Sequence, residues 1–359
     1  MKTTQDVSAS KRILFRCDGS SQLGFGHIVR CIALADELRD QHGFNVDFAM
    51  LKGYLGVKQV QKHGYLVYQP NSDPSEPVNE SLWLQSVVRE SMPQALLLDV
   101  RTDLPVDTLR EIKKNGVMIV TIDDISDRRL IADLAFYPPI PQVDNLDWNQ
   151  FTGKCFVGYE WILLKPVFAD FKGRIPFKRD TSFSRIKLSQ PLNVLVSMGG
   201  SDPAGLTLMM LKVLDTIEAR INVSVLIGNG FMHNDALATW LSGANRKYEL
   251  HRDAQDIPFV MYSSDCAIVS FGVTAYELAA MEVPAIYVCL TDDHHESASY
   301  LEGDLFGVSL GVYTRIASHT IKDRLIQFFA QFNQPLSRPK PFVDGLGYRR
   351  TAAIIDCHI

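Results

Sequence analysis

Short apolar runs alternate with helical patterns along the first half of this chain. Apolar runs typical of buried strands lie at Ile13–Phe15, Val46–Met50, Leu66–Tyr68, Ala95–Leu98 and Val117–Ile122. Between several of these runs, apolar residues recur every three or four positions, which predicts amphipathic helices at Ile28–Leu38 and Leu104–Lys114. Strands that alternate with helices in this way predict a parallel sheet wrapped by helices.

The composition changes between Lys172 and Pro191, where Lys, Arg, Ser and Pro are frequent and apolar periodicity is weak. Such a stretch predicts a linker between domains, or the neighbourhood of one. Beyond it the alternation restarts. Strands are predicted at Leu192–Val196, Val223–Ile227, Cys266–Val269 and Ala285–Cys289, with helices at Leu206–Ile217 and Ala275–Met281.

The two halves predict an α/β protein with two Rossmann-like, doubly wound domains that face a central cleft, where a ligand would bind by default. We expect an N-terminal domain over residues 11–175 and a C-terminal domain over residues 190–340. The remaining residues, 341–359, contain a helical pattern at Tyr348–Ile355. That helix is expected to pack back on one of the domains.

Length and composition exclude several classes of protein. The chain has 359 residues, enough for two domains, with 46% hydrophobic and 21% charged residues. Its net charge of −5 does not favour nucleic acid. Apolar stretches are too short to span a bilayer, and the first ten residues lack a signal core. Six scattered cysteines without CxxC spacing fit reduced thiols. We therefore expect a cytoplasmic protein without membrane insertion, and the oligomeric state, monomer included, stays open.

The segment around His27 predicts a strand, a glycine-bearing loop and the first turn of a helix, with the histidine at the mouth of that helix. Open N–H groups of a first helical turn attract an anion, and histidine is the side chain best suited to take a proton near neutral pH. The combination suggests chemistry on a phosphorylated or nucleotide-linked substrate. The alternative is a histidine that caps the helix or packs in a polar cluster.

Polar residues also follow other predicted strands. Asp18 ends the first strand, where it would orient His27 or bind a sugar hydroxyl, or simply form a turn. Asp99 and Arg101 end another strand, and Arg101 would clamp an anionic group or be solvated. Asp123 and Asp124 look like a metal-binding pair, but aspartate pairs at strand ends are common.

The second half offers a glycine turn and an acidic residue for a nucleotide. Gly199, Gly200 and Ser201 precede a helix whose dipole would favour a diphosphate, unless this is an ordinary strand–helix turn. Glu277 lies in the first turns of the helix after Thr274. A carboxylate there would accept hydrogen bonds from both ribose hydroxyls, or would be a surface partner of the helix dipole.

Several segments resemble one group of proteins, in matching order along the chain from Ile13 to Arg350. They are Asp18–Ser21, Gly24–His27, Arg30-Cys31, Gly158–Leu164, Ser197–Pro203 and Ser270–Leu278. Together they are similar to the nucleotide-sugar hydrolases of pseudaminic acid biosynthesis, which remove UDP from a 2,4-diacetamido-2,4,6-trideoxy sugar. Related spore-coat polysaccharide biosynthesis proteins and, more distantly, the glycosyltransferase that makes lipid II share these features.

The resemblance implies a GT-B fold whose N-terminal domain carries the catalytic base and whose C-terminal domain binds a uracil nucleotide. It implies release of UDP from a UDP-linked amino or deoxy sugar by water that His27 activates, with inversion at the anomeric carbon, in bacterial surface-glycan or nonulosonic acid biosynthesis. It implies no metal and no cofactor. The expected catalytic residues are His27 and Asp18. The expected substrate-binding residues are Ser20, Ser21, Gly24, Gly26, Asp99, Arg101, Gly199, Gly200, Ser201, Gly272, Thr274, Glu277, His295 and Glu296.

The chain departs from the pattern of these hydrolases at two places that would lie near the sugar. It has Asp99-Val100-Arg101 where Asp-His-Tyr or Asp-Ser-Tyr is expected, and Thr291–Ser297 where an Asn-Gln pair is expected. Both departures look closer to the spore-coat branch. His294 and His295 are adjacent, so only one of them would reach a shared ligand on a regular helix.

Three other functions fit parts of the pattern. A glycosyltransferase on the same scaffold would use His27 to activate an acceptor hydroxyl instead of water. A protein that binds nucleotide sugars without turnover would need no base. A dehydrogenase is the weakest option, because the loop before His27 lacks GxGxxG spacing.

Overall fold

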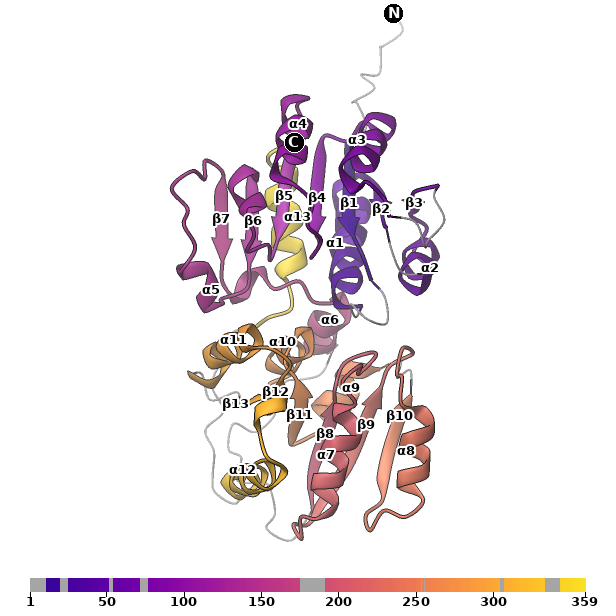
Figure 1. Ribbon diagram of the computed structural model, residues 1–359, viewed down its shortest axis with the longest axis vertical. Coiled ribbons are helices and arrows are strands. Elements are labelled where there is room, and N and C mark those ends of the chain that lie inside the picture. Colours follow the sequence, from indigo (N-terminus) through magenta and orange to yellow (C-terminus); the bar gives the residue numbers. More distant parts are fainter. Residues whose placement is uncertain are drawn as a thin grey trace, which may run out of the picture. The chain divides into compact units, whose positions relative to one another are not determined.

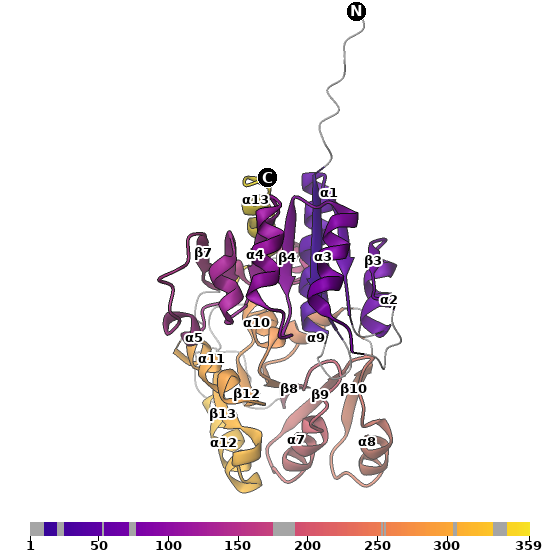
Figure 2. The ribbon, with the colours of Figure 1, turned by 45° about the horizontal axis from the view of Figure 1, so that its top comes forward.

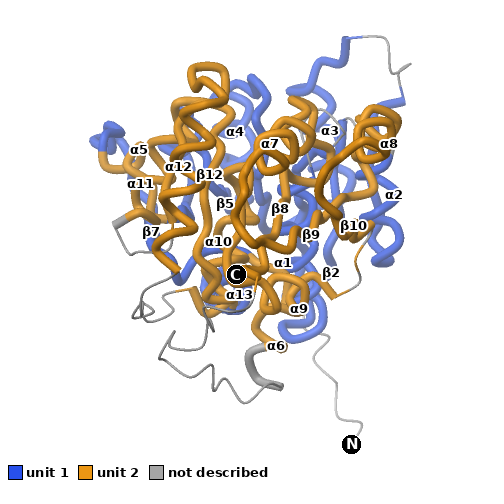
Figure 3. The backbone as a smooth tube through the Cα atoms, turned by 90° about the horizontal axis from the view of Figure 1, so that it is seen from below, with its two compact units in different colours: residues 1–138, 145–163, 346–359 blue, residues 139–144, 164–345 orange. Residues whose placement is uncertain are grey.

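The chain folds into two compact units, which are coloured separately in Figure 3. Unit 1 comprises residues 1–138, 145–163 and 346–359, and unit 2 comprises residues 139–144 and 164–345. The computed structural model describes residues 11–19, 25–51, 54–71, 77–174, 191–252, 254, 256–303, 307–332 and 343–359. The chain thus changes unit after Leu163, earlier than the boundary expected at residue 175. Lys172, the expected start of the linker, lies in a helix of unit 2, and residues 175–190 lie outside the described residues.

Unit 1 contains a parallel sheet with the strand order β3-β2-β1-β4-β5-β6-β7. The strands are β1 (Arg12–Cys17), β2 (Asn45–Ala49), β3 (Leu66–Tyr68), β4 (Ala95–Asp99), β5 (Met118–Ile122), β6 (Leu134–Tyr137) and β7 (Lys154–Val157). The apolar runs predicted the first five. They did not predict β6 and β7, which have only four residues each, and β7 lies at the edge of the sheet with little burial.

Helices cover both faces of this sheet, with α3 and α4 on one face and α1 and α13 on the other (Figures 1 and 2). The helices are α1 (Gly26–His42), α2 (Tyr54–Lys62), α3 (Glu80–Ser91), α4 (Val106–Lys114) and α13 (Gly347–Asp356), with 3₁₀ turns η1 (Asp127–Ile131) and η2 (Tyr159–Trp161). Helix α1 ends at Gly43, whose left-handed backbone suits glycine.

The C-terminal helix α13 completes the core of unit 1. Tyr348, Ala352 and Ile355 are buried in the same apolar cluster as the inner face of α1. At its end, Asp356 pairs with Lys11 and accepts a hydrogen bond from His42 Nδ1 at 3.0 Å, which joins the C-terminus to β1 and α1.

Unit 2 contains a second parallel sheet with the order β10-β9-β8-β11-β12-β13. Its strands are β8 (Leu192–Ser197), β9 (Ile221–Ile227), β10 (Tyr248–Arg252), β11 (Cys266–Ser270), β12 (Ala285–Cys289) and β13 (Gly307–Val312). Its helices are α5 (Pro141–Asp144), α6 (Pro166–Arg174), α7 (Leu206–Asp215), α8 (Asn234–Leu241), α9 (Ile257–Tyr262), α10 (Val273–Ala280), α11 (Asp292–Gly303) and α12 (Ser318–Gln331), with a 3₁₀ turn η3 (Tyr313–Arg315).

Short helix α5 belongs to unit 2 although it lies between two strands of unit 1 in the sequence. Gln142 donates a hydrogen bond to Glu296 at 3.1 Å, and Tyr300 donates one to Asp144 at 2.9 Å, so α5 is fastened to α11. No helix within the described ranges is long and apolar enough to cross a membrane.

Each sheet reverses its strand order once, and this reversal determines where a ligand binds. β1 lies between β2 and β4 in unit 1, and β8 lies between β9 and β11 in unit 2. The loops that leave such neighbouring strands diverge to opposite faces of the sheet, which opens a crevice at the carboxyl ends of the strands. Ligand-binding residues are therefore expected directly after β1, β4, β8 and β11.

Gly347 provides a test of how α13 is attached to unit 1. A Cβ atom added there would lie 2.2 Å from the carbonyl oxygen of Ile162 and 3.0 Å from its nitrogen. We expect Gly347→Ala to lower the stability of unit 1 by about 1–3 kcal/mol, the usual cost of overpacking. Gly243→Ala is the control, because nothing lies within 4 Å of that position. Denaturant unfolding measures both, and equal stability of the two variants would show that the close packing at Gly347 contributes little.

Candidate functional site

At the start of α1, His27 forms a hydrogen bond with a buried carboxylate. Its Nδ1 lies 2.5 Å from Oδ1 of Asp99, the last residue of β4. The Asp99 side chain is inaccessible to solvent, whereas the His27 side chain remains 22% exposed. One face of α1 supplies three contacts to this carboxylate, because positions 27, 30 and 31 adjoin on a helix. They come from His27, Arg30 and Cys31.

Asp99 is held as an anion. Burial alone would raise the pKa of this carboxyl group, but the charges of Arg30 and His27 and their hydrogen bonds hold it well below its usual range. Arg30 forms a two-point contact, with Nε 2.6 Å from Oδ2 and Nη2 2.6 Å from Oδ1. Planar, two-point contacts of this kind are among the strongest hydrogen bonds in proteins.

The charge on Asp99 determines the tautomer of His27. An ionised carboxylate only accepts hydrogen bonds, so the Nδ1 atom of His27 must donate. In the neutral imidazole the other nitrogen, Nε2, then carries the lone pair, and it has no hydrogen-bond partner among the described residues. A histidine oriented by a buried aspartate, with Nε2 free, is the arrangement of a general base.

Beyond Arg30, the network continues to the end of β5. Nη1 of Arg30 lies 3.4 Å from Oδ2 of Asp123, and Nη2 of Arg101 lies 2.8 Å from the same atom. Arg101 also donates to the carbonyl oxygen of Asp123. Asp123 is therefore engaged by two arginines and does not form a metal pair with Asp124, which instead binds Ser126 and Arg128.

Asp18 does not perform the orienting role expected of it. Its Oδ1 accepts a hydrogen bond from the backbone N–H of Leu51 at 2.7 Å, and its Oδ2 lies 2.7 Å from Nη2 of buried Arg16. It therefore stabilises the loop after β2, and Asp99 is the carboxylate that orients His27. The sequence could not separate these two aspartates, because both follow a buried strand and only the position of α1 decides which one meets His27.

Three of the expected residues, Ser20, Ser21 and Gly24, lie outside the described residues. Gly26 is the first residue of α1, directly before His27, and no described side chain caps this end of the helix. Arg30 was not among the expected site residues, although Arg30-Cys31 belongs to the motif shared with the hydrolases. The spacing of three residues from His27 was the signal that could have identified it.

In unit 2, the glycine turn after β8 is closed by the chain itself. Asp202 accepts hydrogen bonds from the backbone N–H groups of Leu206 and Thr207, each at 2.8 Å. The first turn of α7 is thus capped by an internal carboxylate. These two N–H groups are therefore not open to a diphosphate, and binding of a diphosphate by Gly199, Gly200 and Ser201 stays a prediction.

The neighbouring turn after β11 is different. Gly272 precedes α10 and has no side chain that could cap this helix. Its open N–H groups suit an anion. Gly199, whose left-handed backbone suits glycine, borders this turn, since a Cβ atom there would lie 3.7 Å from Oγ of Ser270. Contact of Gly272 and Thr274 with a phosphate likewise stays a prediction.

Glu277 lies one turn further along α10 and is partly buried. Burial raises its pKa to about 7, although the charge of Lys165 opposes the shift. A carboxyl group with a pKa near neutrality is a frequent property of ligand-binding positions, and this one lies on the same helix as the open N-terminus.

His295 and Glu296 both have partners within unit 2. Nδ1 of His295 lies 2.8 Å from Oγ of Ser309 on β13, and Glu296 accepts the hydrogen bond from Gln142 of α5. These contacts secure α11 to its neighbours, and they leave a direct role in binding substrate as a prediction. In the part of the chain that the structure describes, no three His, Cys, Asp or Glu side chains gather as a metal-binding group.

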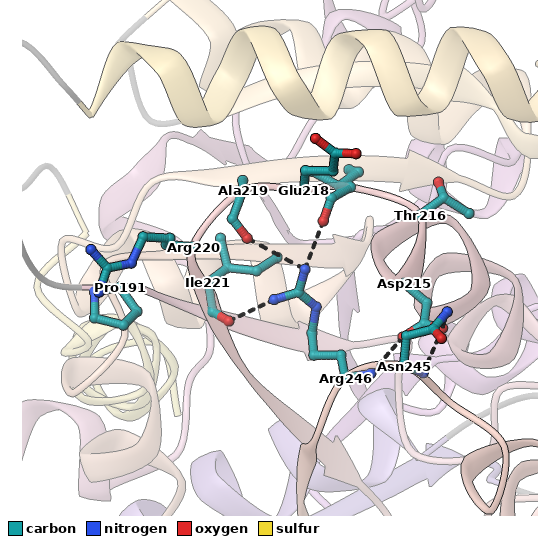
Figure 4. Close-up of a pocket in the computed structure, with 10 residues that line it drawn as sticks. Pro191, Asp215, Thr216, Glu218, Ala219, Arg220, Ile221, Asn245 and Arg246 are labelled. Carbon is teal, nitrogen blue, oxygen red and sulfur yellow. Dashed lines mark hydrogen bonds between the residues drawn. The ribbon is translucent and has the colours of Figure 1, made fainter.

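A hollow of about 620 Å³ lies in unit 2 (Figure 4), at the end of the sheet opposite to these residues. It is lined at the amino ends of β8, β9 and β10 by residues that include Pro191, Arg220 and Arg246. Arg246 donates to the carbonyl oxygen of Ile221 at 2.9 Å, as Figure 4 shows, and to that of Ile217 at 2.7 Å, so it stabilises the turn after α7. The hollow lies at the amino ends of the strands, whereas the candidate site lies at their carboxyl ends, so the two are separate.

Comparison with known proteins gives relatives over most of the chain, although no family model matches it. A spore coat polysaccharide biosynthesis protein of Bacillus subtilis is 21% identical over 349 residues, which cover 94% of this chain and 96% of that protein. A UDP-2,4-diacetamido-2,4,6-trideoxy-beta-L-altropyranose hydrolase of Campylobacter jejuni is 24% identical over 303 residues, 81% of this chain and 96% of that protein. These relatives confirm the resemblance that the sequence motifs indicated.

A third relative, an uncharacterised protein of Methanocaldococcus jannaschii, is 23% identical over 285 residues, or 77% of this chain and 55% of that protein. The chain therefore spans about half the length of this relative.

Solved structures confirm the GT-B fold. Acinetobacter baumannii MurG has a TM-score of 0.65 at 14% identity and covers 97% of this chain and 99% of its own. A complex of Staphylococcus aureus MnaA with UDP has a TM-score of 0.63 at 11% identity and covers 97% of this chain and 96% of its own. At these identities the likeness concerns the fold alone.

The pairing of Asp99 with Arg30 predicts a large effect on stability. Asp99→Asn removes the nearer anionic partner of the Arg30 guanidinium, whose side chain is only 12% exposed, and leaves it only the longer contact with Asp123 at 3.4 Å. Breaking a buried ion pair from one side typically costs about 3–5 kcal/mol. Asp40→Asn is the control on the same helix, because its exposed pair with Arg39 should contribute about 0–1 kcal/mol. Denaturant unfolding of unit 1 compares them, and similar losses in both variants would argue against a structural role for the buried pair.

Proposed function

We propose that this protein is a nucleotide-sugar enzyme of polysaccharide biosynthesis that hydrolyses a UDP-linked amino or deoxy sugar. The observation that carries this proposal is the pairing of His27 with ionised Asp99, which leaves Nε2 as a base at the carboxyl edge of the sheet of unit 1. The relatives from B. subtilis and C. jejuni, which align with most of the chain, support a reaction on a nucleotide sugar.

In the proposed reaction, Nε2 of His27 accepts a proton from water as the water oxygen bonds to the anomeric carbon. The bond between that carbon and the phosphate oxygen breaks, and its electron pair leaves with UDP. The imidazolium that forms is stabilised by Asp99, which remains ionised. UDP is a good leaving group, so a general acid is not required, and direct displacement inverts the anomeric centre.

Unit 2 would bind the nucleotide. The open first turn of α10, with Gly272 and Thr274, offers N–H groups to the diphosphate without a metal. Glu277 would accept hydrogen bonds from the two ribose hydroxyls, as acidic residues do in other doubly wound nucleotide sites. MnaA in complex with UDP has the same fold, which supports placing a uracil nucleotide in this class of structure.

Transfer to an acceptor is the second candidate, because MurG shares the fold and an oriented histidine deprotonates a hydroxyl as readily as water. Arg101 also stands where the hydrolase pattern has another residue, and its guanidinium is 44% exposed beside the histidine network. The two candidates differ only in the nucleophile, so one experiment separates them.

Removing the base should abolish turnover. We expect His27→Ala to slow UDP release from a panel of UDP-amino sugars by roughly 10²–10⁴-fold, the usual contribution of general base catalysis. His42→Ala is a matched control, because His42 lies on the same helix and also pairs with an aspartate, Asp356, at 3.0 Å. It should keep the native rate.

The nucleophile is identified by running the same assay in ¹⁸O-labelled water. Hydrolysis at the anomeric carbon places the label in the free sugar, whereas label in the phosphate would rule out the proposed displacement. If UDP appears only when an alcohol acceptor is added, the protein is a glycosyltransferase and the hydrolase proposal is wrong.

Glu277 should make the affinity for UDP depend on pH. Its pKa of about 7 means that half of the free protein carries a protonated carboxyl group at neutrality. The ribose hydroxyls donate hydrogen bonds, so they favour the ionised form, and binding should release this proton. Affinity is therefore full above pH 7 and falls by up to about tenfold per pH unit below it.

Calorimetric titration of UDP from about pH 5.5 to about pH 8.5 measures this dependence. The phosphate of UDP titrates in the same range, so Glu277→Gln serves as the reference that retains only that contribution. Parallel pH profiles of the native protein and the variant would exclude a carboxylate–ribose contact at Glu277.

A further inference from the structure

The Arg30 guanidinium lies between two carboxylates. On one side, Nε and Nη2 each lie 2.6 Å from an oxygen of Asp99, and on the other side Nη1 lies 3.4 Å from Oδ2 of Asp123. Its side chain is 12% exposed, and Asp99 is fully enclosed. The carboxylate that orients His27 is therefore itself oriented by a second residue of α1, one helical turn after the histidine.

Arg30 is the cation that compensates the charge of Asp99. Among the described residues, the groups that face this carboxylate are His27, Arg30 and the thiol of Cys31, whose Sγ lies 3.5 Å from Oδ2. The thiol is a weak neutral donor, and a neutral imidazole contributes no charge. Without the guanidinium, a buried carboxylate takes up a proton, because its charge is no longer stabilised.

Protonation of Asp99 would reverse the hydrogen bond to His27. A neutral carboxylic acid donates its O–H, so Nδ1 of the imidazole would become the acceptor and the ring proton would move to Nε2. The Nε2 atom would then carry hydrogen and could not accept a proton from the nucleophile. The tautomer of the base therefore depends on Arg30, whose Nη2 also lies 3.2 Å from Nδ1 of His27.

Asp123, on the other side of the guanidinium, also restricts the position of Arg30. The backbone of Asp123 is in the left-handed region, with φ of 53°, which an aspartate tolerates. This conformation allows both its carbonyl oxygen and its carboxylate to contact Arg101. Asp123 is thereby anchored, and Arg30 is confined between Asp123 and Asp99.

We propose that Arg30 is a positioning residue for the His27 base: its two-point contact keeps Asp99 ionised and so selects the imidazole tautomer in which Nε2 is free. The role of His27 as a base rests on the proposed function, whereas the dependence of the tautomer on Arg30 holds with or without turnover. The proposal requires the planar fork of arginine as well as its charge, because a lysine ammonium reaches the carboxylate at a single point.

The test is a measurement of the His27 tautomer in the full-length chain labelled with ¹⁵N, by spectra that correlate ring nitrogens with ring protons. The native protein should show Nδ1 protonated and Nε2 unprotonated. Arg30→Gln should move the ring proton toward Nε2, and Arg30→Lys should give an intermediate mixture. Arg39→Gln is the matched control, because this arginine of α1 pairs with half-buried Asp36 and exposed Asp40, and its replacement should leave the spectrum unchanged.

The rate of UDP release gives the second readout. Arg30→Gln should lower kcat about 10- to 100-fold, the loss typical when the outer partner of a metal-bound histidine is removed, with little change in KM. Its pH–rate profile should shift relative to the native protein, and Arg30→Lys should recover part of the rate. A purely structural role would instead lower the amount of folded protein without altering the tautomer or the pH profile.

The outcomes are separable. A folded Arg30→Gln protein that keeps the native tautomer overturns the proposal whatever its activity. If that variant does not fold, Arg30→Lys decides, since a native tautomer and a native kcat in it would show that the two-point contact is unnecessary. A tautomer that depends on Arg30 in a protein that releases no UDP from any sugar supports the positioning role and refutes the hydrolase.

Discussion

The buried carboxylate of Asp99 is the group on which the chemistry of unit 1 depends. It ends β4 in the middle of the sheet, where water does not reach it, and Arg30, which contacts both oxygens, and His27 stabilise its charge. A buried charge without such compensation would be neutralised by a proton. The same ion pair thus contributes to the stability of the strand end and to the orientation of His27, so the two properties cannot be varied independently.

Strand order explains why the reactive groups gather where they do. Asp99 and Asp123 end neighbouring strands β4 and β5, and α1 returns along the face on which Asp99 lies, because β1 is the central neighbour of β4. Unit 2 repeats the arrangement with β8 and β11, yet its two helix termini differ. Asp202 accepts hydrogen bonds from the first turn of α7, whereas the residue before α10 is Gly272, which has no side chain. The same topology therefore begins one helix with an internal carboxylate cap and the other with a glycine.

The sequence predicted what depends on local pattern and missed what depends on tertiary position. Long apolar runs predicted the central strands, and the loop before His27 predicted a histidine at the start of a helix, as found. Asp18 was expected to orient His27 because it ends the first strand, whereas the contact that forms is with Asp99 and spans 72 positions. The capping of α7 by Asp202 was also missed, since a carboxylate four and five residues ahead of the bonded N–H groups is visible as a cap only once the turn has folded.

The network around Asp99 extends to Arg101, at a position where the chain departs from the hydrolase pattern. Arg101 is the side chain that departs from the hydrolase pattern, and in the structure it contacts Asp123, which in turn contacts Arg30. Replacing Arg101 would therefore affect His27 through two ion pairs, that of Arg101 with Asp123 and that of Asp123 with Arg30. It would also change the surface around the exposed guanidinium of Arg101. Because the inner pair of Arg30 and Asp99 is complete without Arg101, the outer residue is free to vary with the substrate while the tautomer of His27 is preserved. This division would allow one catalytic core to serve relatives that process different sugars.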